Sequence, residues 1–485
     1  MRPLFVAVVA LALAVPVALA ASSSYTAVAP VNASVPSPFD PCAAQPPNPP
    51  DQVVYPNTEV EPQVAVNPTD QNNVIGVYQQ DRWSDGGAHG LLAAVSMDGG
   101  ATYSHTWAQF SACSGNPDEL PRATDPWVSF DKAGRAYQIA LPIIDGALSD
   151  SAVTTSFSTD KGLTWSAPVD LTRDADPLGL VFNDKQSITG DPYQAGRAYA
   201  TWIRGNLPGE EMTFAKLAHA FSYRGLPMFS RTTDGGVTWS TPTQMTNANL
   251  YAQGNQIAVL PDGTLLNVQA ILFKGSGNQP NPNPVFVGVQ RSTDGGKNWS
   301  PAIKIAPLSV AAESADGQPL RVGDYIPDIA VDPRSGAVYV TWAGDLGTGI
   351  NKILLSRSTD GGKKWSTPVV VNHHPNAQSF NHAVTVAQND GNVAVLYYDI
   401  ARNNDSTPGI PTDVYVRDSS DGGQTWNDPL LINSFDFANA PFARGLFLGD
   451  YVGLEPRNGN DLIAFYAVTG GSANTADVIS TQLNR

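Results

Sequence analysis

The nine-residue segment 358–366, Ser-Thr-Asp-Gly-Gly-Lys-Lys-Trp-Ser, has five near copies elsewhere in this 485-residue chain, and the aspartates of neighbouring copies lie 60 to 74 residues apart. An Asp-Gly-Gly core is typical of a hairpin turn, because the carboxylate accepts hydrogen bonds from its own turn and glycine tolerates a positive φ. Each copy therefore predicts a turn between two strands. The six aspartates are Asp98, Asp160, Asp234, Asp294, Asp360 and Asp421.

An aromatic residue closes every copy of this turn. Its fixed place predicts an anchor that packs against the adjoining sheet, which is a structural role and not a catalytic one. The six aromatic residues are Tyr103, Trp165, Trp239, Trp299, Trp365 and Trp426.

Two short apolar runs precede each turn. In the fourth unit, for example, residues 256–260 and 265–273 are separated by Pro261-Asp262-Gly263. Each unit of about 60 residues thus indicates four strands, with no sustained helical periodicity. We predict an all-β fold in which residues 52–485 form a single β-propeller of four-stranded blades.

The blade count depends on the two ends of this region. After the sixth turn, residues 449–454, 461–468 and 477–483 repeat the first three strands of a unit, but a fourth is missing. Residues 50–57 resemble the closing strands of other units. We therefore predict seven blades, the last closed by this N-terminal strand so that no sheet edge stays open, with six blades as the alternative.

Residues 1–20 have the features of a signal peptide: Arg2, an apolar run over 4–19, and Ala18-Leu19-Ala20 as a cleavage site. The mature protein is then expected outside the cell or in the periplasm, with no membrane association after cleavage. An uncleaved membrane anchor is the rival interpretation. Residues 21–51 are rich in Ala, Ser and Pro, a composition that favours an extended or disordered leader.

The chain has two cysteines, Cys42 in the leader and Cys113 after the first turn. Because an exported protein meets oxidising conditions, we predict one disulfide that ties the leader to the first unit, with two free thiols as the alternative.

The net charge is −16, from 28 Lys and Arg against 44 Asp and Glu. This balance argues against nucleic acid or an anionic membrane as a partner, since both reward basic surfaces. An acidic ligand would need a local cluster of arginines. A monomer is expected.

The repeated pattern S/T-x-D-x-G-x-T/N-W resembles the Asp-box, or bacterial neuraminidase repeat, of the sialidase superfamily and other β-propellers. The resemblance implies a glycan or glycoconjugate as partner, but the turn itself is a structural device. In such a propeller, ligand sites lie where first strands begin and second strands end, on the face opposite the Asp-box turns.

The resemblance also implies a definite set of catalytic groups. Sialidases bind the substrate carboxylate with three arginines, use a tyrosine paired with a glutamate as nucleophile, and use an aspartate as acid or base. Matching positions at the predicted face are Arg82, Arg204, Arg402, Arg444, Asp125, Asp324, Tyr325 and Tyr451, with Glu313 and Glu455 as possible partners of the tyrosine.

One departure from the family pattern affects the function. The first inner strand reads Glu61-Pro62-Gln63-Val64, where family enzymes carry Arg-Ile-Pro. Two hypotheses stay open: an exo-acting glycoside hydrolase of sialidase type, and a non-catalytic propeller that binds glycan or protein.

Structural interpretations of the candidate residues also stay open. The repeated Gly-Asp-Tyr at 323–325 and 449–451 could cap strands, and the arginines could pair with rim acids. No cofactor is required. The carboxylates could bind Ca²⁺, although no contiguous calcium loop is present.

Overall fold

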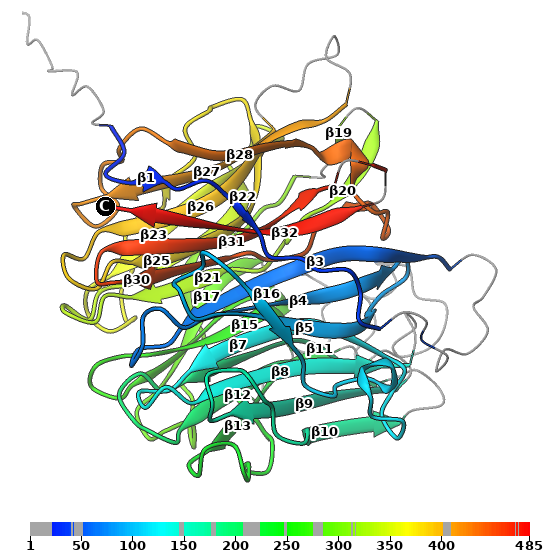
Figure 1. Ribbon diagram of the computed structural model, residues 1–485. Helices are drawn as coiled ribbons and strands as arrows, with labels where there is room; N and C mark the ends of the chain where they lie inside the picture. Colours follow the sequence, from blue (N-terminus) through cyan, green and yellow to red (C-terminus); the bar gives the residue numbers. More distant parts are fainter. Residues whose placement is uncertain are drawn as a thin grey trace, which may run out of the picture.

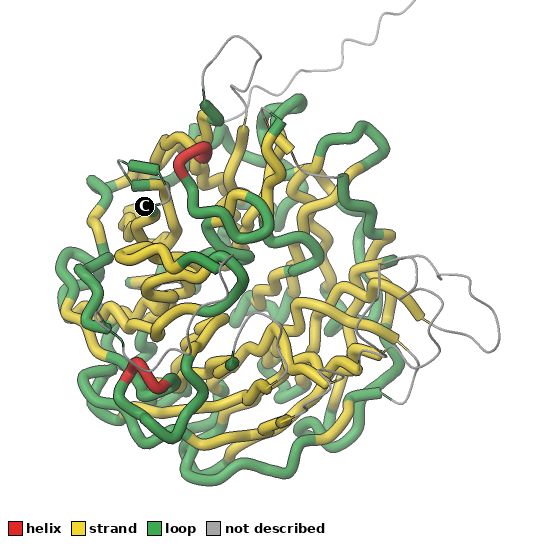
Figure 2. Tube along the Cα trace, turned by 90° about the vertical axis from the view of Figure 1, so that its right-hand side faces the viewer, coloured by secondary structure: helices red, strands yellow, loops and turns green. Residues whose placement is uncertain are grey.

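The computed structural model describes residues 22–39, 42, 52–144, 150–175, 181–206, 224–246, 250–274, 285–311, 314–315, 317–400, 409–470, 472–473 and 475–485. Strands form the body of this part of the chain, and its two helical turns are η1 (Ala112–Ser114) and η2 (Phe437–Asn439) (Figures 1 and 2). The all-β prediction is confirmed. None of the described helices is long and apolar enough to cross a membrane. The predicted signal peptide lies outside the described residues.

Six successive units each contain four strands joined in antiparallel order. The first two are β3 (Val54–Val66), β4 (Val74–Trp83), β5 (Ala88–Ser96), β6 (Ser104–Thr106), and β7 (Arg122–Phe130), β8 (Ala136–Ile143), β9 (Asp150–Ser158), β10 (Val169–Ala175). The third and fourth are β11 (Val181–Gly190), β12 (Ala198–Asn206), β13 (Arg224–Thr232), β14 (Thr243–Gln244), and β15 (Leu250–Val259), β16 (Leu265–Lys274), β17 (Phe286–Ser292), β18 (Ile303–Pro307).

The fifth unit comprises β21 (Asp328–Val331), β22 (Val338–Asp345), β23 (Asn351–Ser358) and β24 (Val369–Val370), and the sixth β25 (Gln378–Val386), β26 (Val393–Ile400), β27 (Pro411–Ser419) and β28 (Leu430–Asp436). A seventh group contains β30 (Gly453–Arg457), β31 (Asp461–Thr469) and β32 (Ala476–Asn484). Outside this pattern, β20 (Gln318–Arg321) pairs with β19 (Ser314–Ala315) and, in parallel, with β29 (Leu446–Phe447).

The N-terminal leader supplies the outer strand of the seventh group. Two short strands, β1 (Thr26–Ala27) and β2 (Val31–Asn32), pair antiparallel with β32, and Figure 1 shows this blue segment beside the red C-terminal strand. Tyr25 and Phe39 of the leader are buried. The leader over residues 22–39 is therefore part of the fold and not a disordered tether.

The predicted closing strand, residues 50–57, is wrong. Val54 and Tyr55 instead begin the inner strand β3 and pair with Trp83 and Arg82 of β4. The physical reason is that the true closing pairs are only two residues long, too short to show the alternating pattern by which a strand is predicted.

All of these sheets are open, and no sheet closes on itself within the described residues. The seven-bladed propeller thus stays a prediction. The first and seventh strand groups nevertheless pack together, because the ring of Phe465 lies against Gly76, where an added β-carbon would be 2.1 Å from a ring atom.

The repeated turns have the hydrogen bonds expected of an Asp-box. In the first copy, Ser96 Oγ donates to Asp98 Oδ1 (2.7 Å), which also accepts the backbone amide of Thr102 (2.9 Å). Both contacts recur in the other five turns. The six aspartates are therefore engaged within their own turns.

The aromatic residue that ends each turn packs on the preceding strand group, as predicted. Trp165 of the second unit donates through Nε1 to Thr106 Oγ1 of the first (3.0 Å). Tyr103 of the first unit donates to Ser480 Oγ of β32 (2.7 Å), so this contact joins the two ends of the fold.

The predicted disulfide between Cys42 and Cys113 is confirmed, with the two Cα atoms 5.4 Å apart. Since Cys113 lies in η1, after the first Asp-box turn, the bond ties the leader to the first unit.

Candidate active site

A cavity of about 570 Å³ opens at the end of the fold where the inner strands begin, and this volume lies within the range of small-molecule sites. This end is opposite the Asp-box turns: Arg122, at the start of β7, pairs with Ile143, whereas Ser158, which opens the second turn, pairs with Ala136 at the other end of β8. The polar and charged residues that line the cavity are Arg82, Asp85, Thr124, Asp125, Asp184, Lys185, Gln253, Arg321, Asp324, Arg444 and Asp450.

A backbone irregularity turns three charged residues toward one another at the cavity floor. Glu61, Asp125 and Lys185 have φ values of 57°, 53° and 49°, and each lies where the register of its inner strand shifts against the next strand. Such bulges re-aim side chains, and left-handed non-glycine residues are strained and cluster at functional sites. The three come from neighbouring units.

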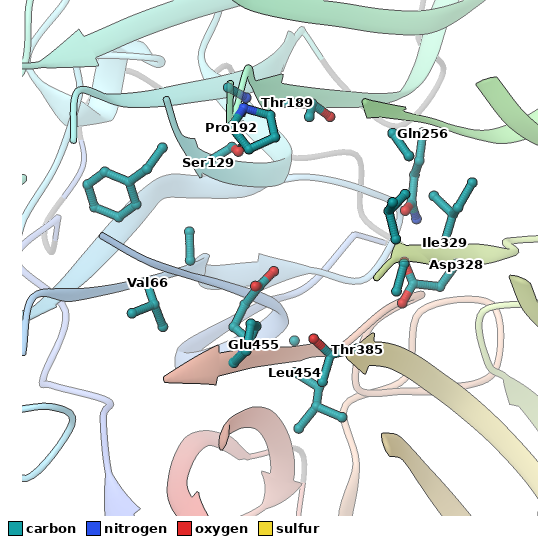
Figure 3. Close-up of a pocket in the computed structure, with 18 of the residues that line it drawn as sticks. Val66, Ser129, Thr189, Pro192, Gln256, Asp328, Ile329, Thr385, Leu454 and Glu455 are labelled. Atoms are coloured by element: carbon teal, nitrogen blue, oxygen red, sulfur yellow. Dashed lines mark hydrogen bonds between the residues drawn. The ribbon is translucent and has the colours of Figure 1, made fainter. Parts of the chain in front are cut away.

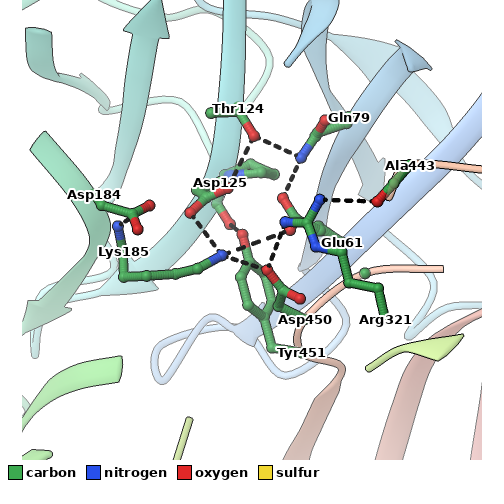
Figure 4. A network of polar contacts seen from close by, with 12 residues as sticks. Glu61, Gln79, Thr124, Asp125, Asp184, Lys185, Arg321, Ala443, Asp450 and Tyr451 are labelled. Atoms are coloured by element: carbon green, nitrogen blue, oxygen red, sulfur yellow. Dashed lines mark hydrogen bonds and ion pairs between the residues drawn. The ribbon is translucent and has the colours of Figure 1, made fainter. Parts of the chain in front are cut away.

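Lys185 is the centre of the resulting charge cluster (Figure 4). Its Nζ lies 3.1 Å from Asp125 Oδ2 and 3.9 Å from Glu61 Oε1, and it donates a hydrogen bond to Asp450 Oδ2. Burial alone would lower the pKa of Lys185, but the charges of Asp125, Asp450 and Glu61 outweigh burial and raise it. The ammonium group therefore stays charged.

The neighbouring carboxyl groups Glu61 and Asp125 are shifted in opposite directions. Burial, followed by the charge of Asp125, raises the pKa of Glu61 well above its usual range. Burial acts in the same sense on Asp125, but the charge of Lys185 and a hydrogen bond with Glu61 lower its pKa overall. Glu61 is therefore the weaker acid of the pair and Asp125 the stronger.

Asp324 is the cavity carboxyl group best suited to exchange a proton. Burial and the charge of Asp450 raise the pKa of Asp324 to about 7. Its Oδ1 atom is buried and has no hydrogen-bond partner among the described residues. Asp450 shows the opposite behaviour, because Lys185 and Arg321 outweigh burial and lower its pKa. One protonated and one ionised carboxyl group is the arrangement used in general acid–base catalysis.

Three arginines face the same cavity. Arg82 and Arg321 both lie on the ring of Phe447, with guanidinium carbons 4.8 and 4.2 Å from its centroid, and Arg444 lines the cavity with them. Burial and the charge of Arg321 lower the pKa of Arg82 to about 10 and also lower that of Arg444. The three cations repel one another, so an anion bound between them would be stabilised.

The predicted site residues are only partly brought together. Arg82, Arg444, Asp125 and Asp324 line the cavity. Arg204 instead forms two hydrogen bonds with Asp174, at 2.6 and 3.0 Å, and is not among the lining residues. Arg402 and Glu313 lie outside the described residues.

Neither predicted tyrosine opens into the cavity. Tyr325 is half-buried against the apolar cluster that contains Val340 and Trp342. Tyr451 is buried below the charge cluster, and its hydroxyl donates to the backbone oxygen of Pro126 (3.2 Å). Burial and the charge of Glu61 raise the pKa of Tyr451 well above its usual range, which disfavours the phenolate.

A second cavity, of about 350 Å³, lies between the inner strands and contains the remaining predicted residue, Glu455 (Figure 3). Burial and the charge of Asp328 raise the pKa of Glu455 to about 8. Residues of β3, β7, β11, β15, β21, β25 and β30 all line this cavity. Neither candidate tyrosine is among the residues that line this cavity.

Sequence reasoning did not find Lys185, Arg321 or the catalytic potential of Glu61. Arg321 is held by the parallel pairing of β20 with β29, which lies outside the repeat. Lys185 and Glu61 occupy the position in the repeat that Asp125 occupies in its own unit, so an alignment of the inner strands would have revealed them.

In the described part of the chain, no group of three or more His, Cys, Asp or Glu side chains is arranged to hold a metal ion.

Parts of this chain are similar in sequence to known proteins. The BNR/Asp-box repeat model matches residues 290–301. A sialidase of Bacteroides fragilis (strain YCH46) is 29% identical over 188 residues, 34% of this chain and 32% of that protein. The xyloglucanase Xgh74A of Acetivibrio thermocellus is 26% identical over 291 residues, 54% of this chain and 31% of that protein. The chain thus spans about a third of the length of these curated relatives.

Among solved structures, Hadza microbial sialidase Hz136 aligns with a TM-score of 0.49 at 17% identity, covering 81% of this chain and 73% of that one. The α-L-arabinofuranosidase Arb93A of Fusarium graminearum aligns with a TM-score of 0.45 at 15% identity, covering 77% and 93%. The repeat match and the Bacteroides relative confirm the resemblance to Asp-box proteins of the sialidase superfamily.

Proposed function

We propose that this chain is an exported seven-bladed propeller that hydrolyses the terminal bond of a glycan whose end sugar carries a carboxylate, as sialosides do. The blade number is supported by the second cavity, which the first strands of all seven strand groups line. A common central space for seven inner strands is what the axis of a seven-bladed propeller requires.

The observation that carries the functional proposal is the meeting of Arg82, Arg321 and Arg444 at one cavity of a strongly acidic protein. Planar guanidinium groups bind a carboxylate through paired hydrogen bonds. Arg321 is partly neutralised by Asp450 (3.2 Å), whereas Arg82 and Arg444 form no ion pair within the described residues. The guanidinium groups of Arg82 and Arg444 thus remain for an anionic ligand, beside that of Arg321.

The proposed chemistry uses carboxyl groups of this cavity. Asp324, with a pKa of about 7, donates its proton to the leaving oxygen as the glycosidic bond breaks. Water then adds to the anomeric carbon and returns a proton to the Asp324 carboxylate. Asp450, held ionised by Lys185 and Arg321, stabilises the positive charge that develops on the sugar. Asp125 is a second ionised carboxylate at the same floor. This assignment replaces a tyrosine nucleophile, because the hydroxyl of Tyr451 is occupied by Pro126.

A non-catalytic glycan-binding propeller is the second candidate. It is favoured by the engagement of Asp125 and Asp450 with Lys185, which leaves fewer free carboxylate oxygens for catalysis. The three arginines would bind a carboxylate-bearing glycan equally well in a protein without catalytic activity.

The two functions are separated by assaying the purified protein with fluorogenic glycosides of a sialic acid, a uronic acid and a neutral sugar. The proposal expects hydrolysis of a carboxylate-bearing member, lost in Asp324→Asn. Binding of the same sugars without turnover by the wild-type protein would support the second candidate. Neither binding nor turnover of any of them would overturn both.

A further inference from the structure

Lys185 has an unusual position for a lysine. Its side chain is only 10% exposed, its backbone has a φ of 49°, and it comes from the third unit. The carboxylates it contacts belong to other parts of the chain, Asp125 in the second unit and Asp450 just before β30. One ammonium group therefore links three separate strand groups at the cavity floor.

We propose that Lys185 is a positioning residue, whose ammonium group fixes the carboxylates of Asp125 and Asp450 in one orientation beneath the ligand. Both oxygens that it contacts are Oδ2 atoms, so each Oδ1 is left for other partners. Asp125 Oδ1 accepts the hydroxyl of Thr124 (2.8 Å), which completes its orientation. The catalytic part of this inference rests on the proposed function; the electrostatic part does not.

The charged groups around Lys185 come from several strand groups, and they are Glu61, Arg82, Asp125, Asp184, Arg321 and Asp450. Four of these are carboxyl groups. Asp450 is also neutralised by Arg321, at 3.2 Å, whereas Asp125 forms its ion pair with Lys185. The loss of Lys185 is therefore expected to affect Asp125 most.

The sign of the pH effect follows from these contacts. In the wild-type protein the pKa values of Asp125 and Asp450 lie below their usual range, so their contribution to stability is present above about pH 4 and is lost as the pH falls. Without Lys185, burial is expected to raise the pKa of Asp125, whereas Arg321 still acts to lower that of Asp450. The contribution of Asp125 is then present at low pH and is lost as the pH rises through the raised value.

The direct test compares Lys185→Met with Lys161→Met in denaturant unfolding at about pH 4 and about pH 7. Lys161 is the matched control, since its ion pair with Asp70 (2.7 Å) is exposed. For Lys185→Met, the drop in unfolding midpoint should be at least about twice as large at the higher pH. For Lys161→Met, a small and similar drop is expected at both. An equal drop for Lys185→Met at both pH values would overturn the proposal.

If Lys185→Met does not fold at neutral pH, the proposal is tested with the double variant Lys185→Met/Asp450→Asn. It removes one charge of each sign and leaves fewer unpaired buried carboxylates. The proposal expects the double variant to fold. A double variant that is no more stable than the single one would contradict it.

The catalytic part of the proposal is tested by measuring the rate of hydrolysis as a function of pH. Lys185→Met should move the acid limb upward by about one pH unit or more, because the carboxylates then ionise later. Lys185→Arg, which keeps the charge, should restore much of the wild-type profile. An unchanged acid limb would contradict the positioning role. Absence of hydrolysis in the wild-type protein would instead overturn the proposed function, and the unfolding comparison would still decide the electrostatic claim.

Discussion

Gly323 and Asp450 are in direct backbone contact, although they come from strand groups that are not consecutive in the chain. A β-carbon added to Gly323 would lie 2.2 Å from the carbonyl oxygen of Asp450. This contact brings the two Gly-Asp-Tyr segments together and places the carboxyl groups of Asp324 and Asp450 in one cavity. The repeated tripeptide therefore has a structural role at Gly323, and its two aspartates both line the cavity.

The substitution Gly323→Ala should destabilise the protein by about 2 kcal/mol or more, because backbone must move to admit the methyl group and the native φ of 30° disfavours alanine. It should also weaken ligand binding by displacing Asp324. Denaturant unfolding measures the first effect. Gly317→Ala is the control for φ alone, since its φ of 72° is also left-handed but no atom lies within 4 Å.

Asp324→Asn should raise stability at alkaline pH. The folded pKa of about 7 lies above the unfolded value, so stability from this group is present below about pH 4 and is lost as the pH rises toward 7. Asparagine removes that loss. Unfolding curves should show a gain of about 2 kcal/mol near pH 8 and little change near pH 4; a gain that does not depend on pH would contradict the raised pKa.

Arg321→Ala should weaken the binding of a free carboxylate-bearing sugar by about tenfold or more, because a charge-assisted hydrogen-bonding group is removed from the cavity. Isothermal titration calorimetry measures the effect. Arg204→Ala is the matched control, since Arg204 pairs with Asp174 and does not line the cavity. Equal affinities for these two variants would show that the cavity is not the carboxylate site.

Cys42→Ser should lower the free energy of unfolding by about 4 kcal/mol, the value expected for opening a loop of 71 residues. The leader that this disulfide retains covers the edge of β32, so the variant should also become sensitive to proteolysis near residues 22–39. If the unfolding midpoint of Cys42→Ser equals that of the wild-type protein, the pairing of β1 and β2 with β32 is enough to hold the leader in place.

The sequence predicted those features that depend on neighbouring residues. The Asp-box turns are made by a carboxylate and the backbone of its own loop, as in Asp98 with Thr102. A short stretch of sequence is therefore enough to predict them. The alternating runs likewise predicted the four-stranded units and the face on which the cavity opens. The disulfide followed from the chain having two cysteines.

The features that the sequence did not predict depend on contacts between distant segments. β1 and β2 are each two residues long and acquire their structure only by pairing with β32. Arg321 reaches the cavity because Leu320 pairs with Leu446 in the short parallel pair β20–β29. Lys185 was overlooked because a single lysine carries no motif, and its importance depends on carboxylates brought in by other units.

The measurement that tests the central claim most directly compares the hydrolysis of a carboxylate-bearing glycoside with that of its methyl ester, which has nearly the same shape but no negative charge. If the arginines recognise the carboxylate, the wild-type protein should prefer the acid by about tenfold or more, and Arg321→Ala should lose most of this preference. Equal rates for acid and ester in the wild-type protein would contradict the account.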